Sequence, residues 1–159
     1  MKFLYLTPLY GFGPDHRHIA VPANAEKKLR KMGDRLAGAD DAVAIYIPEG
    51  TDDVYQVGNM KGRVVGAVRL DPMPLDKDIQ DYFYKDLDGS LRWPIGWPCT
   101  AVYAPPPHDC PVLRSVVTDA HGPTAFRPYV RRLLQGPVDL DPKVRNRLER
   151  WFEAFPALA

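Results

Sequence analysis

The chain has 159 residues, of which 45% are hydrophobic and 26% are charged, and its formal net charge at pH 7 is +1. This length and composition predict one globular domain with a buried core. A net charge near zero excludes a global field that would draw the protein onto nucleic acid or a membrane, so an anion site requires a local cluster of lysine and arginine.

No apolar run approaches the length of a membrane span, and the apolar N-terminal stretch is too short for a signal peptide and is interrupted by Pro8. These features favour a cytoplasmic protein with no membrane partner. In that compartment Cys99 and Cys110 are expected to be free thiols.

The first part of the chain alternates short strands with one helix. Residues 3–6 and 19–21 have the composition of strands. Asn24 is the predicted N-cap of a helix whose apolar residues recur at helical spacing as far as Leu36. Gly33 is expected to end this helix or to loosen it.

The middle of the predicted sheet is a pair of strands at 42–47 and 63–70. Gly66 interrupts the second strand, which indicates a bulge, a bend or the close approach of another backbone. A further short strand is predicted at 54–57, and residues 71–89 form an irregular, acidic segment.

Two Trp-Pro pairs dominate the segment from Arg92 to Cys110. A residue before proline is pushed toward extended geometry, so Trp93 and Trp97 lie on a stiff, non-helical segment that leads into a strand at 100–104. Rigid aromatic side chains of this kind either hold a flat ligand or plug one end of a small barrel. The two interpretations are equally open at this point.

The last part of the chain ends in a clear helix. Residues 112–117 are either a strand or a short helix, and residues 126–134 are ambiguous. Asp141 is the predicted N-cap of the final helix and Pro142 its first residue. The apolar stripe of this helix, which is expected to dock on the core, consists of Val144, Leu148, Trp151, Phe152 and Phe155. The pattern as a whole predicts an α+β domain built on a small, strongly curved sheet or barrel, with one helix near the N-terminus and one at the C-terminus.

The sequence has no strong signature of a metal site or of covalent catalysis. The residues of metal-ligand type are His16, His18, His108, Cys110 and His121, but they follow no known ligand spacing. Neither a nucleophile elbow nor a dinucleotide-binding glycine motif is present. We therefore expect no metal, no cofactor and no catalytic residue.

Basic residues gather in three places. The clusters are Lys27, Lys28, Arg30 and Lys31; Arg127, Arg131 and Arg132; and Arg145, Arg147 and Arg150. A charged helix face is most often only solvated. Together with the aromatic side chains of the Trp-Pro segment, however, the clusters fit phosphate contacts around a pocket for an aromatic base.

The order of the segments resembles the EVE domain, a member of the PUA-like group that also includes the YTH and ASCH domains. Residues 20–24 lead into a helix that contains Met32, and residues 64–68 are similar to the glycine-containing strand of the family. Residues 133–136, followed by the helix from Asp141, are similar to its closing strand and terminal helix. The chain departs from the family at pocket-side positions, with Ile19 near the place of the usual Trp, Pro22 near that of an Arg, and Ile47-Pro48 in place of His-Ser.

The resemblance implies one domain over residues 1–159, with an insertion at about 71–98, and a pseudo-barrel whose pocket takes a modified base from DNA or RNA. Trp93 and Trp97 would then stack on the base, and Asn24 and Gln135 would read its polar edge. The candidate nucleic-acid-binding residues are Asn24, Lys27, Lys28, Arg30, Tyr46, Trp93, Trp97, Tyr103, Arg131, Arg132 and Gln135. A separate nuclease is a conceivable partner of such a module.

Two alternatives remain open. The ASCH relatives imply a small, metal-independent enzyme that cleaves RNA, for which Lys28, Tyr46 and Arg131 would be the reacting set. The near-zero net charge also suits a domain that binds a small ligand or a protein and has no role with nucleic acid.

Overall fold

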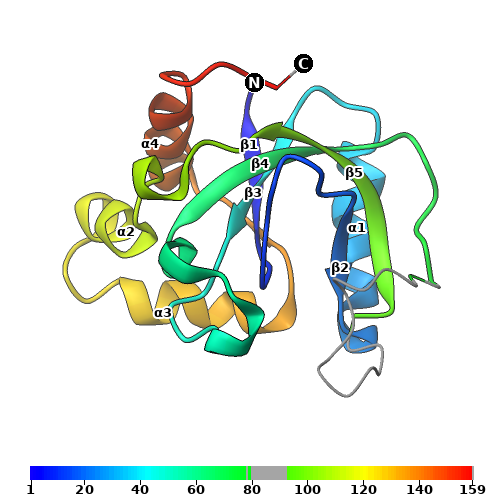
Figure 1. Ribbon diagram of the computed structural model, residues 1–159, viewed down its shortest axis with the longest axis horizontal. Helices are drawn as coiled ribbons and strands as arrows, with labels where there is room; N and C mark the ends of the chain where they lie inside the picture. The colour runs from blue at the N-terminus through cyan, green and yellow to red at the C-terminus, as the bar shows by residue number, and fades with distance from the viewer. Residues whose placement is uncertain (78, 80–92, 159) are drawn as a thin grey trace.

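The computed structural model describes residues 1–77, 79 and 93–158 (Figure 1). Among these residues it contains six strands and four α-helices. The strands are β1 (Phe3–Pro8), β2 (His18–Val21), β3 (Ala42–Tyr46), β4 (Val64–Leu70), β5 (Ile95–Tyr103) and β6 (Val138–Asp139). The helices are α1 (Glu26–Leu36), α2 (Leu113–His121), α3 (Phe126–Arg131) and α4 (Pro142–Phe152).

The strands form one mixed sheet in the order β2-β5-β4-β3-β1-β6. Strands β1 and β3 are parallel, and every other neighbouring pair is antiparallel. All five residues of β3 are buried, as expected for a central strand that is covered on both faces. The chain passes from β1 to β3 through β2 and α1, because parallel neighbours require a long crossover.

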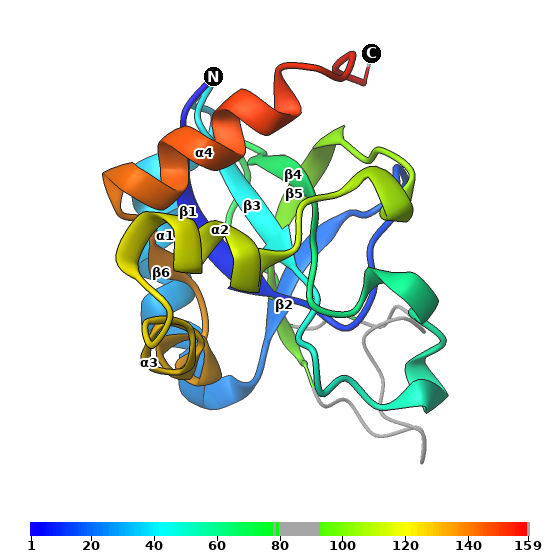
Figure 2. The same ribbon diagram turned by 90° about the vertical axis from the view of Figure 1, so that its left-hand side faces the viewer.

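Helices cover both faces of the sheet. Helix α1 packs on one face, where Leu29 and Met32 are fully buried among side chains of β2, β4 and β5. Helices α2, α3 and α4 cover the other face and enclose a second core around Phe3 and Leu6 of β1. Figure 1 shows α1 on one side of the sheet and α2 and α4 on the other, and Figure 2 shows α4, α2 and α3 one below another across that face.

The predicted α+β class is confirmed, and the expected small curved sheet with flanking helices is compatible with the structure, but the expected pseudo-barrel is not found among the described residues. The described strands do not close into a barrel, because β2 and β6 are the two edges of the sheet and do not pair with each other. No helix in the described part of the chain is long and apolar enough to cross a membrane.

The final helix begins as predicted, but two residues of its predicted stripe are wrong: Trp151 is exposed, and Phe155 lies beyond the end of α4 and is only half-buried. The Asp141 carboxylate accepts hydrogen bonds from the backbone N–H groups of Lys143 at 3.1 Å and Val144 at 3.2 Å, so it caps α4. The buried residues of this helix are Val144, Leu148 and Phe152. Trp151 is 47% exposed, and its indole N–H donates to the carbonyl of Asp109 at 2.9 Å.

Local signals also placed some boundaries wrongly. Residues 53–55 form a 3-10 turn rather than a strand, because Asp52 caps that turn by accepting a hydrogen bond from the Val54 N–H. Asn24 is not the N-cap of α1; Ala25 holds that position without a side-chain hydrogen bond, and Asn24 lies in a preceding 3-10 turn. Gly33 lies inside α1 and does not end it.

The segment from Ile95 to Tyr103 is one long strand, so the extended conformation that the Trp-Pro pairs predict begins earlier than the expected strand at 100–104. The predicted insertion at 71–98 therefore overlaps β5, which pairs with both β2 and β4. Residues 78 and 80–92 of that predicted insertion lie outside the described residues.

Candidate functional site

A cavity of about 1040 Å³ lies at the C-terminal ends of the parallel strands β1 and β3. In the register of this pair Thr7 lies opposite Ile45 and Pro8 lies opposite Tyr46. The chain that follows each strand, at 9–17 and 48–50, lines the cavity, and so do parts of α3 and of the 3-10 segment Arg132–Gln135. Loops that follow parallel strands at the same sheet edge commonly form ligand sites.

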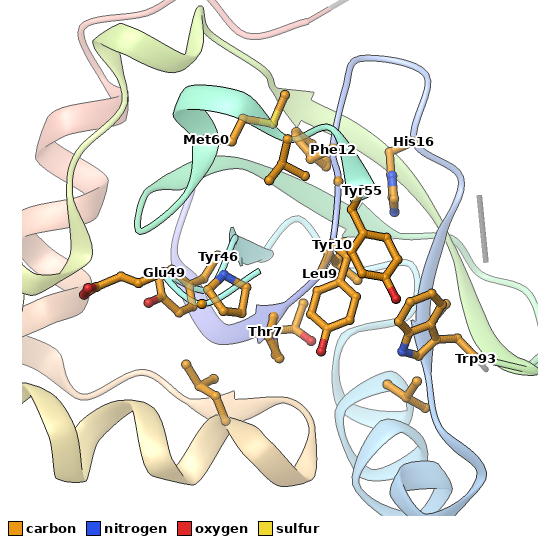
Figure 3. A pocket seen from close by; sticks show the side chains of 18 of the residues that line it. Thr7, Leu9, Tyr10, Phe12, His16, Tyr46, Glu49, Tyr55, Met60 and Trp93 are labelled. Carbon is orange, nitrogen blue, oxygen red and sulfur yellow. The ribbon is translucent and has the colours of Figure 1, made fainter. Parts of the chain in front are cut away.

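One wall of this cavity is aromatic. The ring centroids of Tyr10 and Tyr55 lie 4.9 Å apart, and Trp93 meets Tyr10 edge-on at 5.0 Å and Tyr55 at 6.1 Å. Figure 3 shows the three rings together at one end of the cavity. Mutual packing of this kind restrains the orientation of the three rings. We call this space the aromatic cavity.

The opposite end of the aromatic cavity is polar. The Arg114 guanidinium donates two hydrogen bonds to the Glu49 carboxylate, each at 3.1 Å, and lies 4.3 Å from the centre of the Phe126 ring. Tyr46 is buried beside this pair, and burial raises the pKa of its phenol to about 12. The phenol therefore stays neutral at physiological pH and keeps its O–H as a possible donor.

Thr7 is a fully buried polar residue in the lining of the aromatic cavity. Its hydroxyl oxygen has no hydrogen-bond partner. Figure 3 shows Thr7 between Tyr46 on one side and Tyr10 on the other. A polar group is thus present between the aromatic and polar ends of the cavity.

A second pocket, of about 480 Å³, is basic. The cationic side chains in its lining come from two elements far apart in the sequence: Lys28 and Lys31 from α1, and Arg131 and Arg132 from the end of α3 and the segment after it. Lys28 and Lys31 are three residues apart and so share a helix face. In the described part of the chain neither these two lysines nor Arg131 forms an ion pair. We call this space the basic pocket.

The segment Arg132–Gln135 connects the two spaces. Leu133 and Leu134 line the aromatic cavity, whereas Arg132 and Gln135 line the basic pocket. Leu134 is 84% exposed and lies between the two arginines and Gln135 in the sequence. A ligand in the aromatic cavity would therefore have the basic pocket as its neighbour.

The two tryptophans of the Trp-Pro segment have different environments. Trp93 is half-buried and lines the aromatic cavity. Trp97 is only 5% exposed, belongs to the core between the sheet and α1, and donates its indole N–H to the carbonyl of Asp71 at 3.2 Å. Trp93 thus lies where the pocket interpretation requires it. Trp97 is a core residue between β5 and α1, and it plugs no barrel end because the described strands do not close into a barrel.

The other predicted site residues fall into three groups. Lys28, Arg131, Arg132 and Gln135 meet in the basic pocket, and Tyr46 lines the aromatic cavity. The residues that line neither space are Asn24, Lys27, Arg30 and Tyr103.

Two of these outlying residues have structural partners. Arg30 pairs with Glu26 at 3.1 Å along α1. Tyr103 packs against Phe3 and Phe152 in the core, with ring centroids at 6.2 and 5.6 Å. The set proposed for RNA cleavage is divided, since Tyr46 belongs to one space and Lys28 and Arg131 to the other.

Sequence reasoning did not select Thr7, Tyr10, Glu49, Tyr55 or Arg114 as site residues. The loop at 9–18 and the turn at 48–50 have turn chemistry, and loops at strand ends are frequent ligand sites, so a weak signal existed. Nothing local indicates that Tyr10, Tyr55 and Trp93 meet, because they are far apart in the chain.

The described residues contain no group of three or more His, Cys, Asp or Glu side chains that could hold a metal ion. The His16 ring nitrogen Nε2 lies 2.7 Å from the His18 carbonyl oxygen, and both cysteines are free and buried.

Comparisons with family models, with curated proteins and with solved structures found no significant match to this chain.

Proposed function

We propose that the protein is a nucleic-acid-binding module of the PUA-like, EVE-like type that takes a modified base into the aromatic cavity. The basic pocket would bind the phosphates beside that base. The observation that carries the proposal is the adjacency of the two spaces across Arg132–Gln135, which puts an aromatic cavity and four cationic side chains next to each other.

The aromatic wall supports the first half of the proposal. A base that leaves its stack needs a flat apolar surface, and stacking on an aromatic side chain contributes about 1–3 kcal/mol per base. Trp93 and Tyr10 supply such surface in a restrained arrangement, with ring centroids 5.0 Å apart.

The basic pocket supports the second half. With a net charge of +1, the protein has no general attraction for nucleic acid, so binding requires a local concentration of positive charge. Lys28, Lys31, Arg131 and Arg132 provide it in the basic pocket beside the aromatic cavity. Phosphate contacts of this kind position a strand, and the pocket beside them provides selectivity.

The proposed role is recognition rather than catalysis. Base recognition requires stacking surfaces and a group that senses the modified edge, and it requires no nucleophile. In the described part of the chain the residues suggested for RNA cleavage line two different spaces, which favours the binding module over the enzyme.

Binding to modified oligonucleotides tests the proposal. The wild-type protein would be titrated into short, fluorescently labelled DNA and RNA strands and duplexes that carry one 5-methylcytosine, 5-hydroxymethylcytosine or N6-methyladenine, with unmodified strands as the reference. We expect preferential binding to one modified probe and a loss of affinity of about tenfold or more in Trp93→Ala.

Trp151→Ala is the matched control, because it also removes a partly exposed indole but lies on α4, outside both spaces. It should bind the probe like the wild type. Equal binding by Trp93→Ala and Trp151→Ala, or no binding by the wild type to any probe, contradicts the proposal.

A further inference from the structure

Two threonines, Thr7 and Thr51, are the buried polar residues in the described part of the chain, and the hydroxyl of only one of them has a hydrogen-bond partner. Thr51 is 5% exposed, and its hydroxyl donates to the carbonyl of Pro48 at 2.8 Å. Thr7 is 0% exposed, and its hydroxyl has no partner. Thr51 lies outside the lining of the aromatic cavity, whereas Thr7 is part of it.

An unpartnered buried hydroxyl destabilises a folded protein, because the group loses its hydrogen bonds to water and gains none in return. Such groups are rare in native proteins, and each requires an explanation. Valine has nearly the same shape and would fill the same space without that cost. The hydroxyl of Thr7 therefore does not stabilise the folded state of the free protein.

The position of Thr7 indicates what the hydroxyl is for. It lies near the end of β1, opposite Ile45, in the lining of the aromatic cavity and between Tyr46 and Tyr10 (Figure 3). The Glu49 carboxylate in the same lining is held by the Arg114 guanidinium. A neutral hydroxyl both donates and accepts a hydrogen bond, so it can pair with a carbonyl, a ring nitrogen or an amino group on the edge of a base.

We propose that Thr7 is the specificity-determining residue of the aromatic cavity and forms a hydrogen bond with the edge of the bound base. This inference rests on the proposed function and deepens it. Thr7 would then recognise the polar edge of the base. Asn24 and Gln135 would not, because neither lines the aromatic cavity. Binding of the base would give the hydroxyl the partner that it lacks in the free protein.

The first test compares the stability of two variants without any ligand. Thr51→Val removes a hydroxyl that is hydrogen-bonded, so its thermal midpoint should fall below that of the wild type. Thr7→Val removes one that is not, so its midpoint should stay at the wild-type value or rise. If Thr7→Val is destabilised as much as Thr51→Val, the hydroxyl has a structural partner in the free protein and the inference is overturned.

The second test measures binding of Thr7→Val and Thr7→Ser to the modified strand that the wild type prefers in the oligonucleotide panel. Loss of one neutral hydrogen bond should weaken binding by Thr7→Val about fivefold. Thr7→Ser keeps the hydroxyl and should retain most of the affinity. The ratio of affinities for the modified and unmodified strands should fall in Thr7→Val alone.

The outcomes separate this inference from the proposed function. Binding by the wild type together with unchanged affinity and selectivity of Thr7→Val overturns the role of Thr7 and leaves the base-binding function standing. Absence of wild-type binding to every probe overturns both.

Discussion

The indole of Trp97 occupies the space that a side chain at position 33 would need. A Cβ atom added to Gly33 would lie 2.2 Å from two ring carbons of Trp97 and 2.6 Å from a third. This contact fastens α1 to β5, and it explains why a glycine is found inside a helix, where it costs about 1 kcal/mol relative to alanine.

Gly33→Ala is accordingly expected to destabilise the protein, although alanine is the better helix former. The Trp97 ring is buried and cannot move aside freely, so overpacking should lower the free energy of unfolding by about 1–3 kcal/mol. Urea denaturation measures the change. Asp34→Ala, at the exposed neighbouring position, should cause no comparable loss, and a Gly33→Ala protein as stable as the wild type would disprove the contact.

The Asp141 carboxylate predicts a loss of stability in acid. Burial raises the pKa of this carboxyl, but hydrogen bonds from the Tyr129 hydroxyl at 2.8 Å, from the Val144 N–H and from His121 outweigh burial and lower the pKa below its usual value. A carboxyl with a depressed pKa stabilises the folded state above its unfolded pKa of about 3.9, and this contribution is lost as the pH falls through the lower folded value.

Asp141→Asn tests this prediction, because asparagine keeps the N-cap and removes the charge. Thermal midpoints measured between neutral pH and about pH 2 should be lower for the variant at neutral pH and should converge with the wild type in acid. Asp40→Asn, at an exposed position, is the control. Curves for Asp141→Asn and the wild type that stay parallel down to the lowest pH would contradict the assignment.

The two thiols are expected to be unreactive in the folded protein. Burial raises the pKa of Cys110 to about 11, and burial together with the nearby Asp71 carboxylate raises the pKa of Cys99. Because the thiolate is the reacting species, alkylation of the native protein at pH 8 should be roughly 100-fold or more slower than alkylation in urea. Mass spectrometry would follow both sites, and rapid labelling of the native protein would show that one thiol is accessible.

The basic pocket predicts how salt affects the proposed binding. Each phosphate contact that is lost should make the slope of log affinity against log salt shallower by about 1. Lys28→Ala and Arg131→Ala should each have this effect with the preferred modified strand. Lys27→Ala removes a neighbouring exposed charge of the same helix that lines neither space, so its slope should match that of the wild type. Equal slopes for Lys27→Ala and Lys28→Ala would exclude the basic pocket as the phosphate site.

Features set by neighbours in the sequence could be predicted. The buried run of β3, the glycine-interrupted β4, and the start of α4 at Asp141 all follow from local periodicity or capping. Of the alternatives predicted for Gly66, the close approach of another backbone is confirmed, since a Cβ there would lie 2.2 Å from the carbonyl oxygen of Tyr103. The α+β class follows from the sum of such signals.

The candidate site depended on contacts between distant parts of the chain. Trp93 and Trp97 are each followed by proline, and the packing of α1 on β5 makes Trp97 a core residue and leaves Trp93 in the cavity. Lys28 and Arg131 meet because α1 and the end of α3 lie side by side around one pocket. Local sequence determines which conformation a segment prefers. The packing of strands and helices against one another determines which side chains share a cavity, and local sequence patterns do not predict it because the residues involved are far apart in the chain.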